Sequence, residues 1–340
     1  MKFVKTKQCL FVGSALLLSA AVITGCALSA KIYRTAPTDT FTVSSNDGYY
    51  SETTYFLTEE AYKEHSMQTE ENTQANRKTT LNASAPDADE GEFVLGAIQS
   101  IVVSETVAED GSIADSHPMT ENELEDYGIN PASIGDGNDP WQNSTWGGGG
   151  GSGESDTIIA NKSDEMYLLT LNFELRYSSY TNKYFASGEA VWEDKWVPFW
   201  QTDEAAEEWN LDFMGITWGG EKTLKIENAD FSASYYNDNT VDYSIAKADS
   251  YAGYVWQFNE KSGYLGKELK YARANVDIKK IGTPLNKETN IVLTYIHTYG
   301  AISGGISFEF DSEEKLSAGI SLSLTDKQWQ IQIDIPGIIY

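Results

Sequence analysis

The chain has 340 residues, of which 51 are acidic and 24 basic, giving a formal net charge of −27 at pH 7. So large an acidic excess repels phosphate backbones and anionic headgroups, which argues against nucleic acid as a partner. The two cysteines, Cys9 and Cys26, both lie near the N-terminus, so the rest of the sequence cannot form a disulfide.

The first 25 residues have the layout of a secretory signal. Three lysines precede an apolar run from Leu10 to Ile23, and small residues then lead into Cys26. The run is too short to span a membrane as a helix. Ile23, Thr24, Gly25 and Cys26 resemble, position by position, the lipobox of bacterial lipoproteins. This resemblance implies that Cys26 is lipidated and becomes the N-terminus of the mature protein.

Lipidation of Cys26 would anchor the protein outside the cytoplasm, on the surface of the bacterial cell membrane. Residues 1–25 contain three basic residues and no acid, so the mature chain would carry 21 basic and 51 acidic residues, a net charge of −30. One acyl chain holds a protein only marginally, whereas a diacylglyceryl group with a further palmitate-like chain holds it stably. The membrane is therefore a predicted partner. The acyl chains on Cys26 would bind it, whereas the acidic surface of the protein would not.

Residues 26–89 are predicted to be an acidic and mostly disordered stalk. Apolar residues are too sparse there to form a core. Thr58 followed by Glu59 and Glu60 suits the start of a polar helix over 57–77. No apolar stripe would hold that helix in place, so we expect the segment to lift the folded part off the membrane.

Residues 90–130 are predicted to form a small α+β segment. The stretch from Phe93 to Val103 has the composition of a strand, and Gly96 within it suggests a bulge. Thr120 with Glu123 three residues later predicts a helix that begins with a capping box.

Residues 131–156 are predicted to be a linker rich in Gly, Asp and Asn, with five consecutive glycines from Gly147 to Gly151. They lack the lysine of a phosphate-binding loop and the ligand spacing of an EF-hand. A protease is expected to cut here and to release a stable C-terminal fragment.

Residues 157–340 are predicted to form an all-β domain. Apolar residues alternate with polar ones over 167–177, 291–299 and 329–335, and a period of two places one face of each strand in a core. Further predicted strands are 184–192, 213–218, 241–246, 254–258 and 272–281. With about eight to ten strands and no helices between them, the predicted fold class is mainly β, with an antiparallel β-sandwich as the C-terminal domain.

The C-terminal runs 306–310, 316–324 and 329–335 are separated by short polar turns. This predicts a three-stranded antiparallel meander that ends at Pro336. The hairpin between Ile302 and Leu324 also has the period of the stem of a β-pore-forming protein. Every half-buried hairpin shares that period, so the stem is an alternative without further support.

Residues of catalytic type form no complete constellation in the sequence. His65 and His117 lack a second ligand at metal spacing, and His297 lies on an aromatic strand face, which predicts a core residue. Motifs of zinc hydrolysis and of α/β-hydrolases are missing. No catalytic residue, metal ligand or cofactor is predicted, and a non-enzymatic role is favoured over catalysis.

The densest aromatic cluster comprises Trp192, Trp196, Trp200 and Trp209. Pro198 and the acids between these residues predict that part of the cluster lies in a surface loop, with Trp200 partly exposed and Trp192 buried. Exposed aromatic rings suit stacking on sugars or on a partner protein. The carboxylate pairs Glu193–Asp194 and Asp203–Glu204 lie close by, as a glycosidase would need, but neighbours on a strand point to opposite faces.

The sequence therefore predicts a membrane-anchored bacterial surface lipoprotein with a non-enzymatic binding or structural role. Its predicted partners are the membrane and either a glycan or a surface protein. The alternative is a carbohydrate-binding or glycoside-hydrolysing surface protein that uses Trp196, Trp200 and Trp209.

Overall fold

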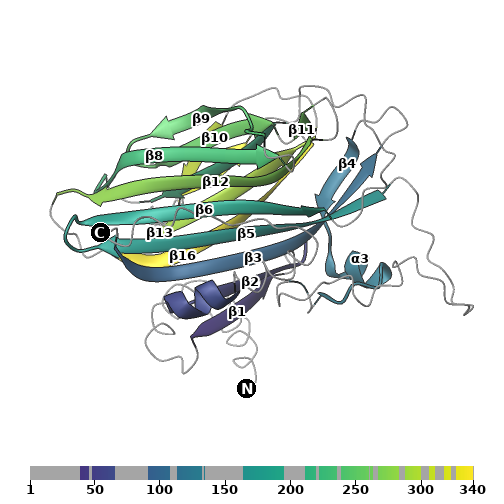
Figure 1. The fold of residues 1–340 in the computed structure, drawn as a ribbon, viewed down its shortest axis with the longest axis horizontal. Helices are drawn as coiled ribbons and strands as arrows, with labels where there is room; N and C mark the ends of the chain where they lie inside the picture. The colour runs from purple at the N-terminus through teal and green to yellow at the C-terminus, as the bar shows by residue number, and fades with distance from the viewer. Residues whose placement is uncertain are drawn as a thin grey trace, which may run out of the picture.

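The structure is a computed structural model. It describes residues 39–45, 48–65, 91–107, 113–131, 134, 164–194, 211–219, 222–235, 239–259, 261–262, 267–282, 288–299, 306–310, 318–322 and 327–339. These residues are mainly β, and their two large antiparallel sheets pack against each other, which confirms the predicted fold class (Figure 1). No helix within these ranges is long and apolar enough to cross a membrane.

The larger sheet has nine strands in the order β1-β2-β3-β5-β6-β12-β11, with β4 beside β3 and β8 beside β12 (Figure 1). Its strands are β1 (Thr40–Ser45), β2 (Ser51–Phe56), β3 (Glu92–Val107), β4 (Ile113–Pro118), β5 (Asp164–Ser178), β6 (Lys183–Asp194), β8 (Leu224–Tyr235), β11 (Lys261–Ser262) and β12 (Lys267–Lys280). The strands predicted at 167–177 and 184–192 are β5 and β6, and they form a hairpin with Ser178 opposite Lys183.

The smaller sheet has five strands in the order β16-β13-β7-β10-β9. These strands are β7 (Leu211–Trp218), β9 (Tyr243–Asp249), β10 (Gly253–Asn259), β13 (Glu288–Thr298) and β16 (Gln328–Ile339). A separate two-stranded sheet consists of β14 (Ile306–Phe310) and β15 (Ala318–Leu322).

Alternating side chains of both sheets fill one core between them. The inward residues of β5 run from Tyr167 to Leu175 at every second position, and those of β16 are Trp329, Ile331, Ile333 and Ile335. Both sets match the predicted period of two. At Gly188 in β6 the sheets approach so closely that an added Cβ would lie 2.4 Å from Leu293 of β13.

The segment expected to be a stalk is folded where the structure describes it. β1 and β2 extend the larger sheet beside β3, and residues 59–65 are helical. Thr58 begins this helix as predicted, since its Oγ1 accepts the Ala61 N–H at 3.4 Å. Tyr62 lies so close to Gly96 that an added Cβ would come within 2.4 Å of its ring. The Tyr62 ring also packs against Phe56 and Phe93, and Glu59 pairs with Arg176 at 2.7 Å. Aromatic contacts and an ion pair thus hold a helix that lacks an apolar stripe. Gly96 provides the space for Tyr62 and does not form the predicted bulge.

The segments 90–130 and 157–340 share one sheet and one core. β3 pairs with β2 on one side and with β5 over fourteen residues on the other. Leu95, Ile101 and Val103 of β3 lie in the same core as the side chains of β5. Because the pairing joins residues on either side of the predicted linker, this linker does not separate two independent cores.

The predicted helix after β4 is α3 (Glu121–Asp126), and both hydrogen bonds of its capping box are present between Thr120 and Glu123. Gly128 follows with φ of 72°, a conformation that favours glycine. Leu124 and residues of β3 and β5 form a second apolar cluster on the outer face of the larger sheet. Local sequence was sufficient to locate this helix.

The predicted C-terminal meander is wrong. β16 pairs with β13 and not with β15, while β14 and β15 pair with each other and cover the outer face of the smaller sheet. That face is also apolar, with Phe213, Val255 and Ile296 beneath Ile320 of the hairpin. The strand β16 also continues past Pro336, which lies where the register with β13 shifts, a position at which a sheet tolerates proline.

Candidate functional site

Three ionisable side chains meet between the two sheets, near one end of the sandwich. Glu105 comes from the end of β3 in the larger sheet, whereas Asp212 of β7 and His297 of β13 come from the smaller sheet. Their exposed fractions are 1%, 0% and 0%. Each continues the period of two of its strand's apolar core residues, and this is why all three point inward.

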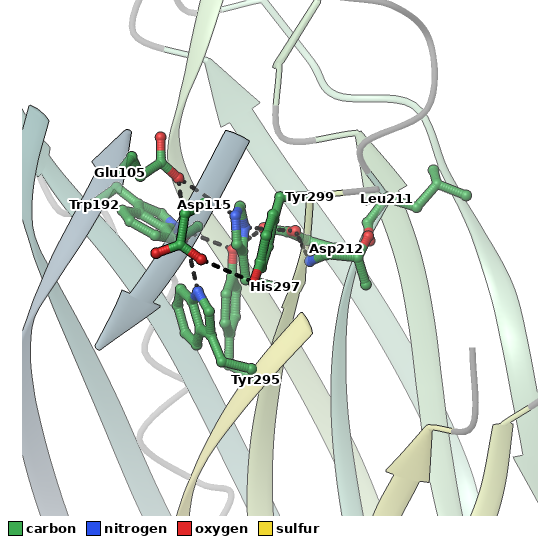
Figure 2. Close-up of polar contacts among 11 residues, drawn as sticks. Glu105, Asp115, Trp192, Leu211, Asp212, Tyr295, His297 and Tyr299 are labelled. Carbon is green, nitrogen blue, oxygen red and sulfur yellow. Dashed lines mark hydrogen bonds and ion pairs between the residues drawn. The ribbon is translucent and has the colours of Figure 1, made fainter. Parts of the chain in front are cut away.

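The imidazole of His297 lies between the two carboxyl groups (Figure 2). Its Nδ1 is 3.1 Å from Oδ1 of Asp212, and its Nε2 is 3.4 Å from Oε1 of Glu105. The ring is thus in polar contact with both sheets through its two nitrogens.

Asp212 receives several hydrogen bonds in addition to that from His297. The hydroxyl of Tyr295 donates to its Oδ2, and the backbone N–H of Thr298 donates to its Oδ1 at 3.4 Å. The indole Nε1 of Trp192, on β6, in turn donates to the Tyr295 hydroxyl at 3.0 Å. Three donors on one buried carboxyl group replace the hydration that burial removes.

Glu105 has its own link between the sheets. The hydroxyl of Ser116, on β4, donates to Oε1 of Glu105 at 3.3 Å. The indole Nε1 of Trp329, on β16, donates to the same hydroxyl at 3.0 Å. Hydrogen bonds therefore run from the smaller sheet through Ser116 to the acid in the larger sheet.

The contact between His297 and Glu105 depends on a proton. If Nδ1 of His297 donates to Asp212, its Nε2 and the carboxyl group of Glu105 are both acceptors unless one of them is protonated. A proton on either the imidazole or the acid would make the contact between Nε2 and Oε1 attractive, and at 3.4 Å the two atoms are within ion-pair distance. Such a proton would link β13 to β3 in a core of low dielectric.

Aromatic rings enclose the cluster. The centroids of Trp192 and Trp329 lie 5.9 and 5.0 Å from that of His297, and Tyr299 stacks beside it at 6.1 Å. With its polar groups facing one another and large rings around them, the cluster is suited to joining the two sheets. Among the described residues, no group of three or more His, Cys, Asp or Glu side chains could hold a metal ion.

The predicted site residues differ in what the structure says of them. Cys26, Trp196, Trp200 and Trp209 lie outside the described residues. Trp192 is 4% exposed and His297 is fully buried, which confirms that both are core residues. Because Trp192 is buried, it cannot stack on a sugar or a partner protein at the surface.

Sequence reasoning missed Asp212 and Glu105, because acids are abundant in this chain. Their position in the strand was a usable signal of burial. Glu105 follows Ile101 and Val103 at every second position of an apolar strand, so it lies on the face that points into the core. It also missed the surroundings of His117, which contacts Asp115 at 2.8 Å and Glu123 at 3.1 Å on the surface.

No family model matches the chain, and a search of characterised proteins finds no match. Among solved structures, a protein described as a pore-forming protein is 10% identical and covers 53% of this chain and 95% of its own, with a TM-score of 0.24. The Clostridium perfringens delta-toxin is 10% identical over 52% of this chain and 86% of its own, also at 0.24. The membrane-inserted form of the Clostridium perfringens NetB toxin is 9% identical over 53% of this chain and 93% of its own, at 0.22. Likenesses this weak carry no argument.

Proposed function

We propose that this chain is a bacterial surface lipoprotein, anchored through a lipidated Cys26, whose β-sandwich has a binding or structural role. The observation that carries the proposal is the signal-like segment that ends in Ile23, Thr24, Gly25 and Cys26. The first described strand begins at Thr40, fourteen residues later. Such a link spans at most about 50 Å, so lipidation would hold the sandwich near the bilayer.

A binding or structural role is favoured over catalysis by the position of the residues that the structure brings together. Glu105, Asp212 and His297 are enclosed in the core and face one another. In that position they stabilise the contact between the sheets and do not face a substrate. The partner we propose is a surface protein or a glycan. The glycan alternative now depends on Trp196, Trp200 and Trp209 without Trp192.

Replacement of the proposed lipidation site tests the anchor. Cys26→Ala is expected to move the protein from the membrane fraction to the soluble fraction or to leave the signal uncleaved, because no thiol remains at the lipobox. Fractionation of cells, together with metabolic labelling by a palmitate analogue, measures both effects. Cys9→Ala is the matched control and is expected to behave as the wild type. A Cys26→Ala protein that is labelled, cleaved and sedimented like the wild type would disprove the anchor.

A further inference from the structure

The strand register shows at which end of the sandwich the N-terminal segment enters. Thr40, the first residue of β1, pairs with Phe56, which pairs with Gly96, which in turn pairs with Glu174 of β5. Glu174 lies four residues before the end of β5 at Ser178. The chain that follows Cys26 therefore joins the sheet near the end at which β5 turns into β6.

The turn between β5 and β6 carries Tyr180, which is 97% exposed and is the most exposed large hydrophobic residue in the described ranges. The turn is held firmly. The Tyr177 hydroxyl donates to Oδ1 of Asn182 at 2.9 Å, and the backbone N–H of Lys280 donates to the Asn182 carbonyl at 3.0 Å. The tyrosine ring is thus presented to solvent on a rigid support.

Lysines gather around this turn. They are Lys183, Lys222, Lys225, Lys279 and Lys280. Lys279 of β12 pairs directly with Lys183 on one side and with Lys225 on the other. The ammonium group of Lys280 lies 4.7 Å from the ring centre of Tyr177 and 4.9 Å from that of Tyr184.

On the side of this end where these lysines lie, the described acids are Glu227, Asp249 and Asp277. The other side, beside β1 and β2, is acidic, since Asp39, Glu59, Glu60 and Glu64 lie there with the bases Lys63 and Arg176. Glu227 is neutralised by ion pairs with both Lys183 and Lys279. The lysine side of this end therefore carries five lysines against three acids, whereas the whole chain has a net charge of −27. An anionic bilayer repels an acidic protein least where its surface is basic, and the exposed lysines on this side attract the headgroups.

We propose that the end of the sandwich carrying Tyr180 faces the membrane, with the tyrosine ring at the level of the lipid headgroups and Lys222 and Lys225 beside it. Tyrosine is enriched at membrane–water interfaces because its ring is apolar and its hydroxyl polar. The inference rests on the proposed anchoring through Cys26. The opposite end of β5, at Asp164, lies ten residues beyond Glu174, about 33 Å further from where the anchored segment enters.

A fluorophore attached to a single cysteine tests this orientation. Processing would remove Cys9 and lipidate Cys26, so Tyr180→Cys and Lys327→Cys each introduce one free thiol into the full lipoprotein. Lys327 is exposed at the opposite end, beside the start of β16. The labelled proteins are reconstituted into vesicles of phosphatidylcholine and phosphatidylglycerol with brominated acyl chains.

The label at position 180 is expected to lose most of its fluorescence to the brominated lipid, while the label at position 327 keeps it. In a second comparison, Lys222→Glu combined with Lys225→Glu should reduce the quenching at position 180 when phosphatidylglycerol is present. Vesicles that float with both proteins but quench the two labels equally, or quench position 327 more, overturn the proposed orientation alone. Failure of both proteins to float overturns the anchor and the orientation with it.

Discussion

Asp212 and Glu105 flank the same imidazole, but they accept different hydrogen bonds. Asp212 accepts from Tyr295, His297 and the backbone of Thr298, and an asparagine could not accept all three because its amide nitrogen donates. In Glu105 a single oxygen, Oε1, accepts from Ser116 and also faces Nε2 of His297. A glutamine can therefore keep one of these two contacts, as an acceptor from Ser116 or as a donor to a neutral His297. The two acids therefore differ in how well an amide can replace them.

We expect Asp212→Asn to lower the free energy of unfolding by about 3–5 kcal/mol, the usual cost of breaking a buried polar pair. Glu105→Gln is expected to cost less, about 1–3 kcal/mol, because only one of the two contacts of Oε1 is lost. Urea denaturation of the two isosteric variants measures the difference. Equal large losses would show that the cluster needs a negative charge on Glu105 and not merely a proton between β3 and β13.

Burial raises the pKa of Asp334 on β16 to about 6, from an ordinary value of 3.8. Its Oδ1 is buried without a hydrogen-bond partner among the described residues. An acid whose pKa is higher in the folded chain than in the unfolded chain binds its proton more tightly when folded. Folding is therefore favoured below about pH 4 and loses stability as the pH rises through about 6, by at most about 3 kcal/mol.

Asp334→Asn should remove this pH-dependent loss, since the amide stays neutral. Its melting temperature is expected to exceed that of the wild type at pH 7.5 and to equal it at pH 4. Thermal melts at the two pH values compare the proteins directly. A variant that melts below the wild type at pH 7.5 would mean that the charged carboxyl group has a partner that stabilises it.

At the scale of elements, the β14–β15 hairpin differs from the other described strands in how it is held. Its two strands pair only with each other, so side chains alone fix it to the smaller sheet. Ile320 is 3% exposed and packs with Phe213, Val255 and Ile296. By contrast, Leu293 lies in the main core within a strand that is paired on both sides.

Ile320→Ala is expected to speed hydrogen exchange in β14 and β15 while leaving β13 protected, because only the outer apolar cluster is weakened. Leu293→Ala removes the same kind of side chain from the main core. It should destabilise the whole sandwich by about 2–5 kcal/mol. Hydrogen exchange with mass spectrometry, read strand by strand, separates the two patterns. Uniform loss of protection in both variants would mean that the hairpin and the sandwich unfold as one unit.

At the scale of the whole molecule, β3 is an interior strand that comes from before the glycine-rich segment. It pairs with β2 and β5 and supplies Leu95, Ile101 and Val103 to the main core. A fragment that starts after the segment would lose these side chains and expose a long edge of β5. The stable C-terminal fragment predicted from the sequence is therefore no longer expected.

Limited proteolysis between residues 147 and 163 should give two pieces that stay together through a gel-filtration column. Residues 157–340 expressed alone should be insoluble or lack a cooperative thermal transition. Co-expression with residues 26–146 is the matched test, and it is expected to restore a soluble complex. A cooperative melt of residues 157–340 alone would show that β3 is dispensable for the core.

The sequence by itself determined the features that depend on neighbours along the chain. Alternation placed the correct face of β5, β13 and β16 in the core, and Thr120 with Glu123 located α3. The same alternation predicts that His297 is a core residue, and the structure confirms this. These features follow from strand period and helix capping, which act within a few residues.

Only the tertiary structure decided which strands pair and which polar groups meet. A period of two shows which face of a strand is buried, but it does not show which strand pairs with it. The sequence therefore predicts that β16 continues the C-terminal hairpin, whereas in the structure it pairs with β13. Glu105, Asp212 and His297 are about 85 to 190 residues apart in sequence, and they meet only because β3 faces β7 and β13 across the core. Contacts of this kind depend on the packing of two sheets, which no local pattern encodes.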